Sequence, residues 1–291
     1  MVSDNDLLSF GYGSMQAGRP SQTAFGAALH RAAHQLRTQP LVFDDPFALL
    51  IVGKDAEAVL RQDGHSRHAR LGLQALIAAR SRLAEDAMIE ALGRGGRRYV
   101  VLGAGLDTFA YRAITRFPDV TVYEVDHPAT QAWKRQQVND ARLPAAPNLV
   151  YVPVDFEREA LTDRLADVGF SFAQPAVFAW LGVVPYLTMP AIEAALSLIA
   201  AMPSATEVIF DYAEPAKDGA DSALAARVAQ IGEPLHSFFT PQVLAQKLKD
   251  MGISHIEDWD AAALNARYFE GRKDGLRLSG RAHVMRARIQ G

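Results

Sequence analysis

The feature that most constrains the fold of this chain is an apolar run that meets a glycine turn near residue 100. Tyr99–Leu102 has the length and apolar character of a buried parallel strand, the turn Gly103-Ala104-Gly105 interrupts it, and an amphipathic segment begins at Asp107. A strand, a tight glycine turn and a helix start are together typical of the nucleotide-binding corner of a doubly wound α/β sheet. Because backbone N–H groups at a helix start are free, such a corner favours a ligand with negative charge or lone pairs.

The same turn disfavours a dinucleotide ligand. The dinucleotide fingerprint G-x-G-x-x-G has its third glycine where this sequence has Thr108. That glycine lets the helix pack closely beneath a pyrophosphate. The pattern therefore favours a smaller nucleotide-like ligand over NAD, and a purely structural turn is the alternative.

Apolar runs of strand length alternate with helical patterns after this turn, which predicts βαβ units and a parallel sheet. No clear helix separates the last two runs, so they are expected to form an antiparallel edge. The further strands are expected at Val120–Val125, Leu149–Val154, Ala176–Leu181, Glu207–Tyr212, Ile253–Trp259 and His283–Ile289.

Only helical patterns precede Arg97. Ser21 is placed to cap a helix that reaches about Gln35, and a longer helix is expected from about Ala69 to Leu92. We therefore predict an α/β fold, a doubly wound Rossmann-like sheet of mostly parallel strands under an N-terminal helical cap. Residues 1–96 are assigned to the lead-in and cap, and residues 97–291 to the ligand-binding core.

Composition excludes several classes of function. The chain has no cysteine, which rules out disulfides, thiolate metal sites and a cysteine nucleophile. A formal net charge of −3 gives no basic footprint for nucleic acid. No metal is expected, because the eight histidines are scattered and the pairs His30/His34 and His65/His68 are not part of a metal-ligand pattern. With no apolar run of about 18 residues and no signal-peptide pattern, we expect a cytoplasmic protein that does not enter a membrane.

Acidic residues end two of the expected strands. Asp126 lies 21 residues beyond Gly105, the spacing at which a carboxylate meets ribose hydroxyls. Glu124, two residues earlier on the same strand face, is the competing candidate, and a helix-capping role for Asp126 is the alternative. At the end of the next strand, Asp155 and Phe156 suit the amine and the ring face of an adenine, unless Asp155 only caps the following helix.

Two arginines of the long cap helix point to different sides. Arg82 and Asp86 are spaced as a surface ion pair, and Arg80 points about 200° around the helix from Arg82. If this helix covers the sheet, one arginine is able to bind a ligand carboxylate with its planar guanidinium. His127 and His236 lie beside the expected site segments, where structural roles are the alternative.

These segments together resemble the leucine carboxyl methyltransferase-like family of class I S-adenosylmethionine-dependent methyltransferases. The resemblance covers about residues 20–260. It rests on Val-Leu-Gly-Ala-Gly-Leu-Asp-Thr-Phe-Ala-Tyr-Arg112, Glu124-Val-Asp-His-Pro128, Val154-Asp-Phe156 and Leu181-Gly-Val-Val-Pro-Tyr-Leu-Thr188. It implies a seven-stranded sheet with a reversed edge strand and an N-terminal helical cap, in agreement with the pattern above.

The resemblance also implies a cofactor site for S-adenosylmethionine. By this resemblance, the turn from Gly103 through Ala104 to Gly105 lines the methionine part, and Arg80 holds the cofactor carboxylate. Asp126, with His127 beside it, is expected at the ribose, and Asp155 with Phe156 at the adenine.

Position 181 departs from the family pattern. The family often has a Glu there, near the cofactor's amino group, whereas this chain has Leu181, whose backbone is still able to contact the cofactor. The departure disfavours methylation of a protein phosphatase and favours a small-molecule acceptor, such as a carboxylic acid or a secondary-metabolite intermediate.

We expect O-methylation, with a carboxyl acceptor favoured and a phenol or alcohol hydroxyl as the other option. A carboxylate is already ionised at neutral pH and needs no general base, whereas a hydroxyl does. The acceptor pocket is expected between the cap and residues 212–240, with Tyr186, Tyr212 and His236 as candidate contacts. An NAD-dependent oxidoreductase and a non-catalytic S-adenosylmethionine-binding protein are the alternatives.

Overall fold

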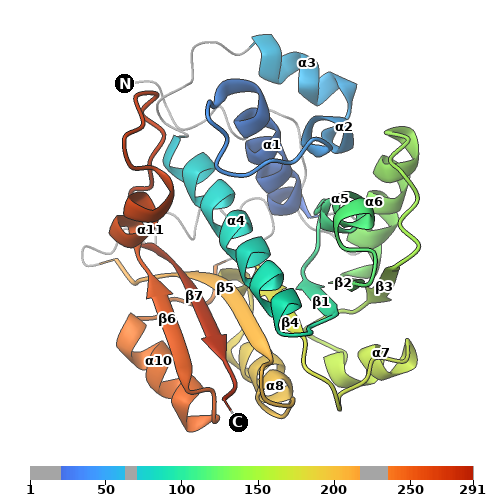
Figure 1. The fold of residues 1–291 in the computed structure, drawn as a ribbon, viewed down its shortest axis with the longest axis vertical. Helices are drawn as coiled ribbons and strands as arrows, with labels where there is room; N and C mark the ends of the chain where they lie inside the picture. Colours follow the sequence, from blue (N-terminus) through green and yellow to red (C-terminus); the bar gives the residue numbers. More distant parts are fainter. Residues whose placement is uncertain (1–20, 63–70, 217–234, 291) are drawn as a thin grey trace.

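The computed structural model describes residues 21–62, 71–216 and 235–290 of the chain. Its centre is a seven-stranded sheet with the order β3-β2-β1-β4-β5-β7-β6 and helices on both faces (Figure 1). This arrangement confirms the predicted doubly wound α/β fold. The strands are β1 Arg98–Leu102, β2 Thr121–Asp126, β3 Leu149–Pro153, β4 Val177–Trp180, β5 Glu207–Ala213, β6 His255–Trp259 and β7 Ala282–Arg288.

Strand direction follows the connections. β1 to β5 pair in parallel, because helical crossovers join them. β7 is the reversed strand, and it lies one place in from the edge, antiparallel to both β5 and β6. The helices are α1 Gln22–Arg37, α2 Ala48–Val52, α3 Lys54–Gln62, α4 Leu71–Gly93, α5 Phe109–Arg116, α6 Pro128–Asp140, α7 Leu161–Asp167, α8 Met189–Ala200, α10 Pro241–Asp250 and α11 Ala261–Tyr268.

Two apolar cores lie on opposite faces of the sheet. On one face, α4 crosses the central strands (Figure 1) and buries Ala79, Leu83 and Ala87 against strand residues such as Ile209. On the other face, α7, α8 and α10 pack against alternating residues of the same strands, as the period-2 geometry of a strand requires. Within the described residues, no helix is both long and apolar enough to cross a bilayer.

The cap begins as predicted. The Ser21 hydroxyl accepts the Ala24 N–H at 3.0 Å and starts α1. A third apolar cluster joins α1 and α2 to Leu106, which follows the glycine turn. The cap therefore packs on the part of the core where the ligand is predicted.

One expectation about the C-terminal region was wrong. The last two strands are separated by a helix, α11, which starts where the Asp260 side chain accepts the Ala263 N–H at 2.7 Å. Its two turns bury only Leu264 completely, so its helical periodicity is weak in the sequence. The antiparallel pairing of β6 and β7 nevertheless forms across it.

Candidate cofactor and acceptor site

The glycine turn is held by the sheet and by the cap. The N–H groups of Gly103 and Ala104 both donate to the Val125 carbonyl, at 2.8 and 3.0 Å. Gly103 and Gly105 have φ of +69° and +49°, where a side chain is strained. A Cβ on Gly103 would overlap Val183. The turn therefore needs its glycines for its own geometry, whichever ligand it binds.

Asp126 joins this turn to the end of β2. Its two carboxylate oxygens accept the N–H groups of Gly105 at 2.5 Å and His127 at 2.7 Å. Burial raises the pKa of Asp126, and these two N–H bonds lower it. Each oxygen keeps a further lone pair, so the carboxylate is still able to accept hydrogen bonds from two ribose hydroxyls.

Glu124, the competing acid, lies elsewhere. Its side chain is fully buried and accepts a hydrogen bond from Lys134 of α6 at 2.5 Å. Burial raises the pKa of Glu124 to about 7, although Lys134 acts in the opposite direction. Glu124 therefore fastens α6 to the sheet, and Asp126 is the acid at the glycine turn.

Asp155 and Phe156 follow the end of β3, as predicted. One Asp155 oxygen accepts the Glu157 N–H at 3.1 Å, and the Phe156 ring packs half-buried against the core. Asp155 does not cap α7, whose N-cap is Ala160. His127 does cap a helix, because its Nδ1 accepts the Ala129 N–H at 3.2 Å.

Arg80 extends from α4 to the ends of β4 and β5. Its Nη1 donates to Asp211 at 2.6 Å, and both side chains are close to nine-tenths buried. The other Asp211 oxygen accepts the Gly182 N–H at 2.5 Å. Gly182 has φ of +74°, and a Cβ there would lie 2.7 Å from Arg80 Nη2. Leu181 is partly buried in the apolar cluster beneath α4.

Asp211 was missing from the predicted site. The rule that selected Asp126 and Asp155, an acid at the carboxyl end of a parallel strand, applies equally to Asp211 in β5. The signal was therefore present in the sequence.

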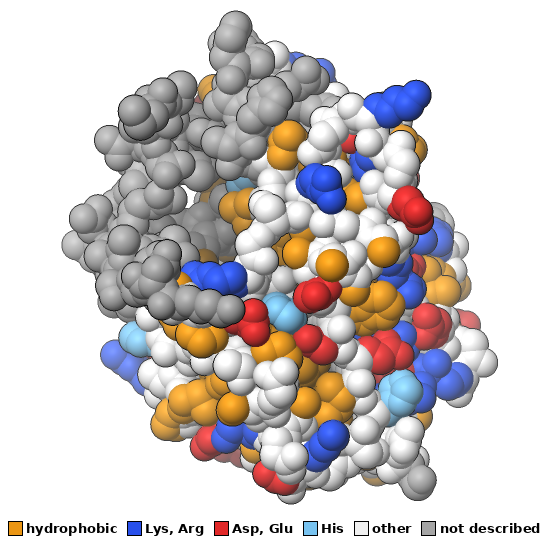
Figure 2. Space-filling view, turned by 90° about the vertical axis from the view of Figure 1, so that its left-hand side faces the viewer, with side chains coloured by type: hydrophobic (Ala, Val, Ile, Leu, Met, Phe, Trp, Pro, Cys, Tyr) orange, Lys and Arg blue, Asp and Glu red, His pale blue; other side chains and the backbone are white. Residues whose placement is uncertain are grey.

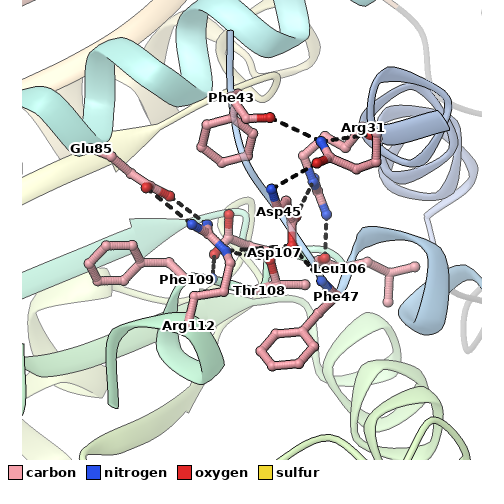
Figure 3. Close-up of polar contacts among 11 residues, drawn as sticks. Arg31, Phe43, Asp45, Phe47, Glu85, Leu106, Asp107, Thr108, Phe109 and Arg112 are labelled. Carbon is pink, nitrogen blue, oxygen red and sulfur yellow. Dashed lines mark hydrogen bonds and ion pairs between the residues drawn. The ribbon is translucent and has the colours of Figure 1, made fainter. Parts of the chain in front are cut away.

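A buried ionic network, also absent from the predicted site, fastens the cap to the segment after the glycine turn (Figure 3). Arg31 of α1 donates to the Leu106 carbonyl at 2.5 Å, and its Nε lies 3.3 Å from Asp45. Arg112 of α5 donates to Glu85 of α4 at 2.5 Å, and its Nε lies 3.5 Å from Asp45. Asp45 thus links both arginines.

Thr108, which stands in place of a third glycine, belongs to the same network. It is fully buried, and its hydroxyl accepts a hydrogen bond from Arg112 Nε at 3.0 Å. Burial raises the pKa of Glu85, while the Arg112 guanidinium lowers it. The network fixes the cap relative to the predicted cofactor site.

The segment from His236 to Phe239 lies beside the elements that carry the other two predicted acceptor contacts, Tyr186 and Tyr212. The His236 N–H donates to the Pro185 carbonyl at 2.8 Å, which brings exposed His236 beside the 3₁₀ turn η2, Val184–Tyr186. Tyr212 packs edge-on against Phe239, with ring centroids 6.5 Å apart. Residues 217–234 of the expected pocket region, and His65 and His68, lie outside the described residues.

The Tyr212 hydroxyl already has a partner. It donates to Asp258 of β6 at 2.9 Å, and the second Asp258 oxygen lies 2.8 Å from His283 Nδ1. The His283 ring stacks on Tyr212, and its Nε2 lies 3.7 Å from Glu214. Burial raises the pKa of Tyr212 well above its usual range, so the phenol stays protonated. This cluster lies on the face of the sheet opposite Asp211.

The described surface has a hollow elsewhere, and its charges are mixed. A shallow hollow lined by Ile89, Arg97 and Phe117 lies at the amino edge of the sheet, away from these residues. The face in Figure 2 shows acidic and basic side chains interspersed with apolar ones rather than one extended basic patch. Among the described residues, no group of three or more acidic, histidine or cysteine side chains is placed to hold a metal.

Comparison with known proteins identifies the family of the chain. The family model described as leucine carboxyl methyltransferase matches residues 24–200, more than half of the chain. A Bacillus subtilis protein named "Putative S-adenosyl-L-methionine-dependent methyltransferase YktD" is 30% identical, over 94% of this chain and 99% of its own length. A Frankia alni protein with the same description is 33% identical over 63% of this chain and 65% of its own length.

A solved structure shares the fold. The structure described as a "putative methyltransferase" from Thermobifida fusca superposes with a TM-score of 0.58 at 16% identity, and the match covers 95% of this chain and 97% of that one. The chain belongs to the leucine carboxyl methyltransferase family. The match includes Arg80, the glycine turn, Asp126 and Asp155, the residues placed here around the carboxyl ends of the strands.

Proposed function

We propose that this protein transfers a methyl group from S-adenosylmethionine to an oxygen atom of a small-molecule acceptor. It is a methyltransferase by its family, and its cofactor is S-adenosylmethionine. The observation that carries the proposal furthest is the position of Arg80, a nearly buried guanidinium at the end of β4 with donors to spare.

The residues present fit this cofactor. Asp126 offers free lone pairs beside the glycine turn, and Arg80 offers N–H donors beside Gly182. When bound, S-adenosylmethionine supplies a methyl group on a positively charged sulfur. The protein's contribution is to hold donor and acceptor about 3–3.5 Å apart in line and to exclude water. The ionic network through Asp45 fastens α1 of the cap to α5, the helix that follows the glycine turn (Figure 3).

A carboxyl acceptor is our first candidate. A carboxylate is already ionised at neutral pH and needs no general base. A carboxyl acceptor therefore does not require Tyr186, Tyr212 or His236 to act as a base. The phenol of Tyr212 stays protonated, so it would act here through packing and its bond to Asp258.

A hydroxyl acceptor is the second candidate, and the pair His283–Asp258 supports it. Asp258 orients the His283 ring through Nδ1, which leaves Nε2 as the nitrogen able to take a proton. Glu214 faces that nitrogen at 3.7 Å, and Tyr212 stacks beneath the ring. If this pair serves as the base, His283→Ala will reduce turnover of phenols at least about 100-fold and leave carboxylic acids unaffected.

Calorimetry followed by an acceptor screen tests the proposal. S-adenosylmethionine and NAD are titrated separately into the full-length protein, and S-adenosylhomocysteine release is then measured with panels of carboxylic acids, phenols and alcohols. The proposal expects binding of S-adenosylmethionine alone and product from an oxygen acceptor. Binding of NAD alone, or product only from amines, would contradict it. Cofactor binding without product from any panel would favour the non-catalytic alternative.

A further inference from the structure

We propose that Arg31 of the cap is a positioning residue for cofactor binding. Through the Leu106 carbonyl it holds the backbone that orients Asp126, the acid predicted at the ribose, and it touches no cofactor atom itself. The inference rests on the proposed function, because it makes the affinity for the ribose part of S-adenosylmethionine depend on a helix of the cap.

The orientation of the Asp126 carboxylate depends on two backbone N–H groups. One oxygen accepts the Gly105 N–H at 2.5 Å, and the other accepts the His127 N–H at 2.7 Å. Because each N–H holds one oxygen, the plane of the carboxylate follows the two peptide groups. A shift of either peptide would turn the remaining lone pairs away from the ribose hydroxyls.

Arg31 holds the segment that carries the first of these N–H groups. Its Nη2 donates to the carbonyl of Leu106, the residue after Gly105, at 2.5 Å (Figure 3). Arg31 and Leu106 are both buried, so loss of the guanidinium would leave a buried carbonyl without its donor. The carbonyl would have to turn toward another donor, and the neighbouring Gly105 would move with it.

The start of α1 touches the segments on both sides of Asp126. A Cβ on Gly105 would lie 2.9 Å from the Cβ of Ala24, so the first turn of α1 packs directly against the glycine. The Ser21 N–H donates to the Thr130 hydroxyl at 3.3 Å, in the first turn of α6, the helix that starts two residues after Asp126. The cap helix therefore contacts both segments that give an N–H to this carboxylate.

Asp45 keeps the Arg31 guanidinium in place. The Asp45 side chain is fully buried, and its Oδ2 accepts a hydrogen bond from Arg31 Nε at 3.3 Å. The planar guanidinium is thus held by an acid at Nε and by a carbonyl at Nη2. The bond to Asp45 stays within the cap, whereas the bond to Leu106 reaches the segment that follows the glycine turn. The second bond is the one that a role in positioning requires.

Calorimetry with two matched ligands tests the inference on the full-length protein. The probes are S-adenosylhomocysteine and its dideoxy analogue, which lacks both ribose hydroxyls. Wild type should bind the analogue at least about tenfold more weakly, because hydrogen bonds to a carboxylate are lost. Arg31→Met should bind S-adenosylhomocysteine at least about tenfold more weakly than wild type does, whereas its affinity for the analogue should change less than about threefold.

Three further variants separate positioning from the stability of the cap. His34→Gln changes a buried histidine that bonds to backbone N–H groups of the cap, so it should bind both ligands as wild type does. Ala24→Val leaves every charge in place but presses on Gly105, so it should weaken S-adenosylhomocysteine alone, by at least about threefold. Arg31→Lys keeps a cationic donor and should recover at least about threefold of the affinity that Arg31→Met loses.

The outcomes separate the two proposals. If wild type binds neither ligand, the proposed function fails and the inference fails with it. If wild type binds both ligands equally well, only the inference fails. It also fails if Arg31→Met weakens both ligands to the same extent or weakens neither, because Arg31 then serves stability alone. If Arg31→Met does not fold, Ala24→Val decides the same question, and an equal loss with both ligands would overturn the inference.

Discussion

Two carboxylates on one strand show how differently the two ends of this sheet use charge. Glu207 and Asp211 lie four residues apart on the same face of β5, and each meets an arginine from the region of α4, Arg94 and Arg80. Glu207, at the amino end, is fully buried and also contacts Arg286 at 2.7 Å and Arg288 at 3.8 Å. Asp211, at the carboxyl end, pairs with one arginine among the described residues.

The two ends of β5 differ in whether hydrogen-bond donors and acceptors remain free. Around Glu207, Arg286 is further engaged by Glu90 at 2.6 Å, so the cluster is closed on itself. Around Asp211, counting only partners in the described parts of the chain, the arginine keeps free donors and the carboxylate keeps free lone pairs. Ligands of doubly wound sheets bind at the carboxyl ends of the strands. We therefore expect the cluster around Glu207 to contribute to stability and the pair at Asp211 to lie where a ligand binds.

The largest effect on stability is expected from Glu207→Ala. Removal of this carboxylate leaves buried positive charge without its central partner, which costs about 3–5 kcal/mol when a buried ion pair is broken. Urea denaturation measures the loss, and calorimetry on the folded fraction should find unchanged affinity for S-adenosylhomocysteine. A tenfold loss of affinity would remove the contrast between the two ends of β5.

The second prediction concerns the acid sensitivity of the cap, which is expected to come from His34. His34 is buried in the cap, where its Nε2 accepts the N–H groups of Val42 and Phe43 at 3.1 and 3.3 Å. Burial lowers the pKa of His34 to about 4. The unfolded chain therefore takes up a proton between pH 6.5 and 4 that the folded chain refuses, and stability falls as pH falls through this window.

The size of this effect is on the order of 3 kcal/mol across the whole window. The stability of wild type relative to His34→Gln should decline by that amount from pH 7 to pH 4 in urea titrations. His236→Gln, which changes an exposed histidine, is the control and should show no such decline. A constant difference between wild type and His34→Gln would mean that the cap does not carry this acid sensitivity.

Gly182→Ala tests the open end of β5 with a smaller cost in stability. The methyl group would meet the Arg80 guanidinium, and alanine is strained at φ of +74°. We expect a loss of about 1–2 kcal/mol in stability and at least a tenfold weaker binding of S-adenosylhomocysteine. Gly252→Ala has a similar positive φ with open space around it, so it should lose stability alone.

The smallest effect is expected from Arg82→Ala. Arg82 pairs with Asp86 at 2.8 Å on the outer side of α4, as its spacing predicted, and about half of its side chain is exposed. Such a pair contributes about 0.3–0.5 kcal/mol. The melting temperature should barely change. A large shift would show that the Arg82 side chain makes a larger contribution to stability than an exposed ion pair does.

Local patterns were enough to predict most of the fold. The glycine turn, the alternating runs and the Ser21 cap each depend on residues close in sequence, and the structure confirms them. Helix α11 was missed because its two turns bury little. Asp126, at the end of β2, was located by the same local rule that would also have found Asp211.

The missing parts of the site depend on contacts between distant residues. Arg80 and Asp211 are 131 positions apart, and nothing local indicates that they pair. The bond from Tyr212 to Asp258 spans 46 positions and needs the antiparallel register of β5, β7 and β6. Such pairs follow from how the strands are ordered in space, which one sequence does not specify.

The central claim is that the carboxyl ends of the strands bind S-adenosylmethionine through Arg80 and Asp126. A crystal structure of the complex with S-adenosylhomocysteine tests it most directly. The account predicts the ligand carboxylate within hydrogen-bond distance of Arg80 and the ribose hydroxyls within hydrogen-bond distance of Asp126. A ligand that lies away from both residues would contradict it.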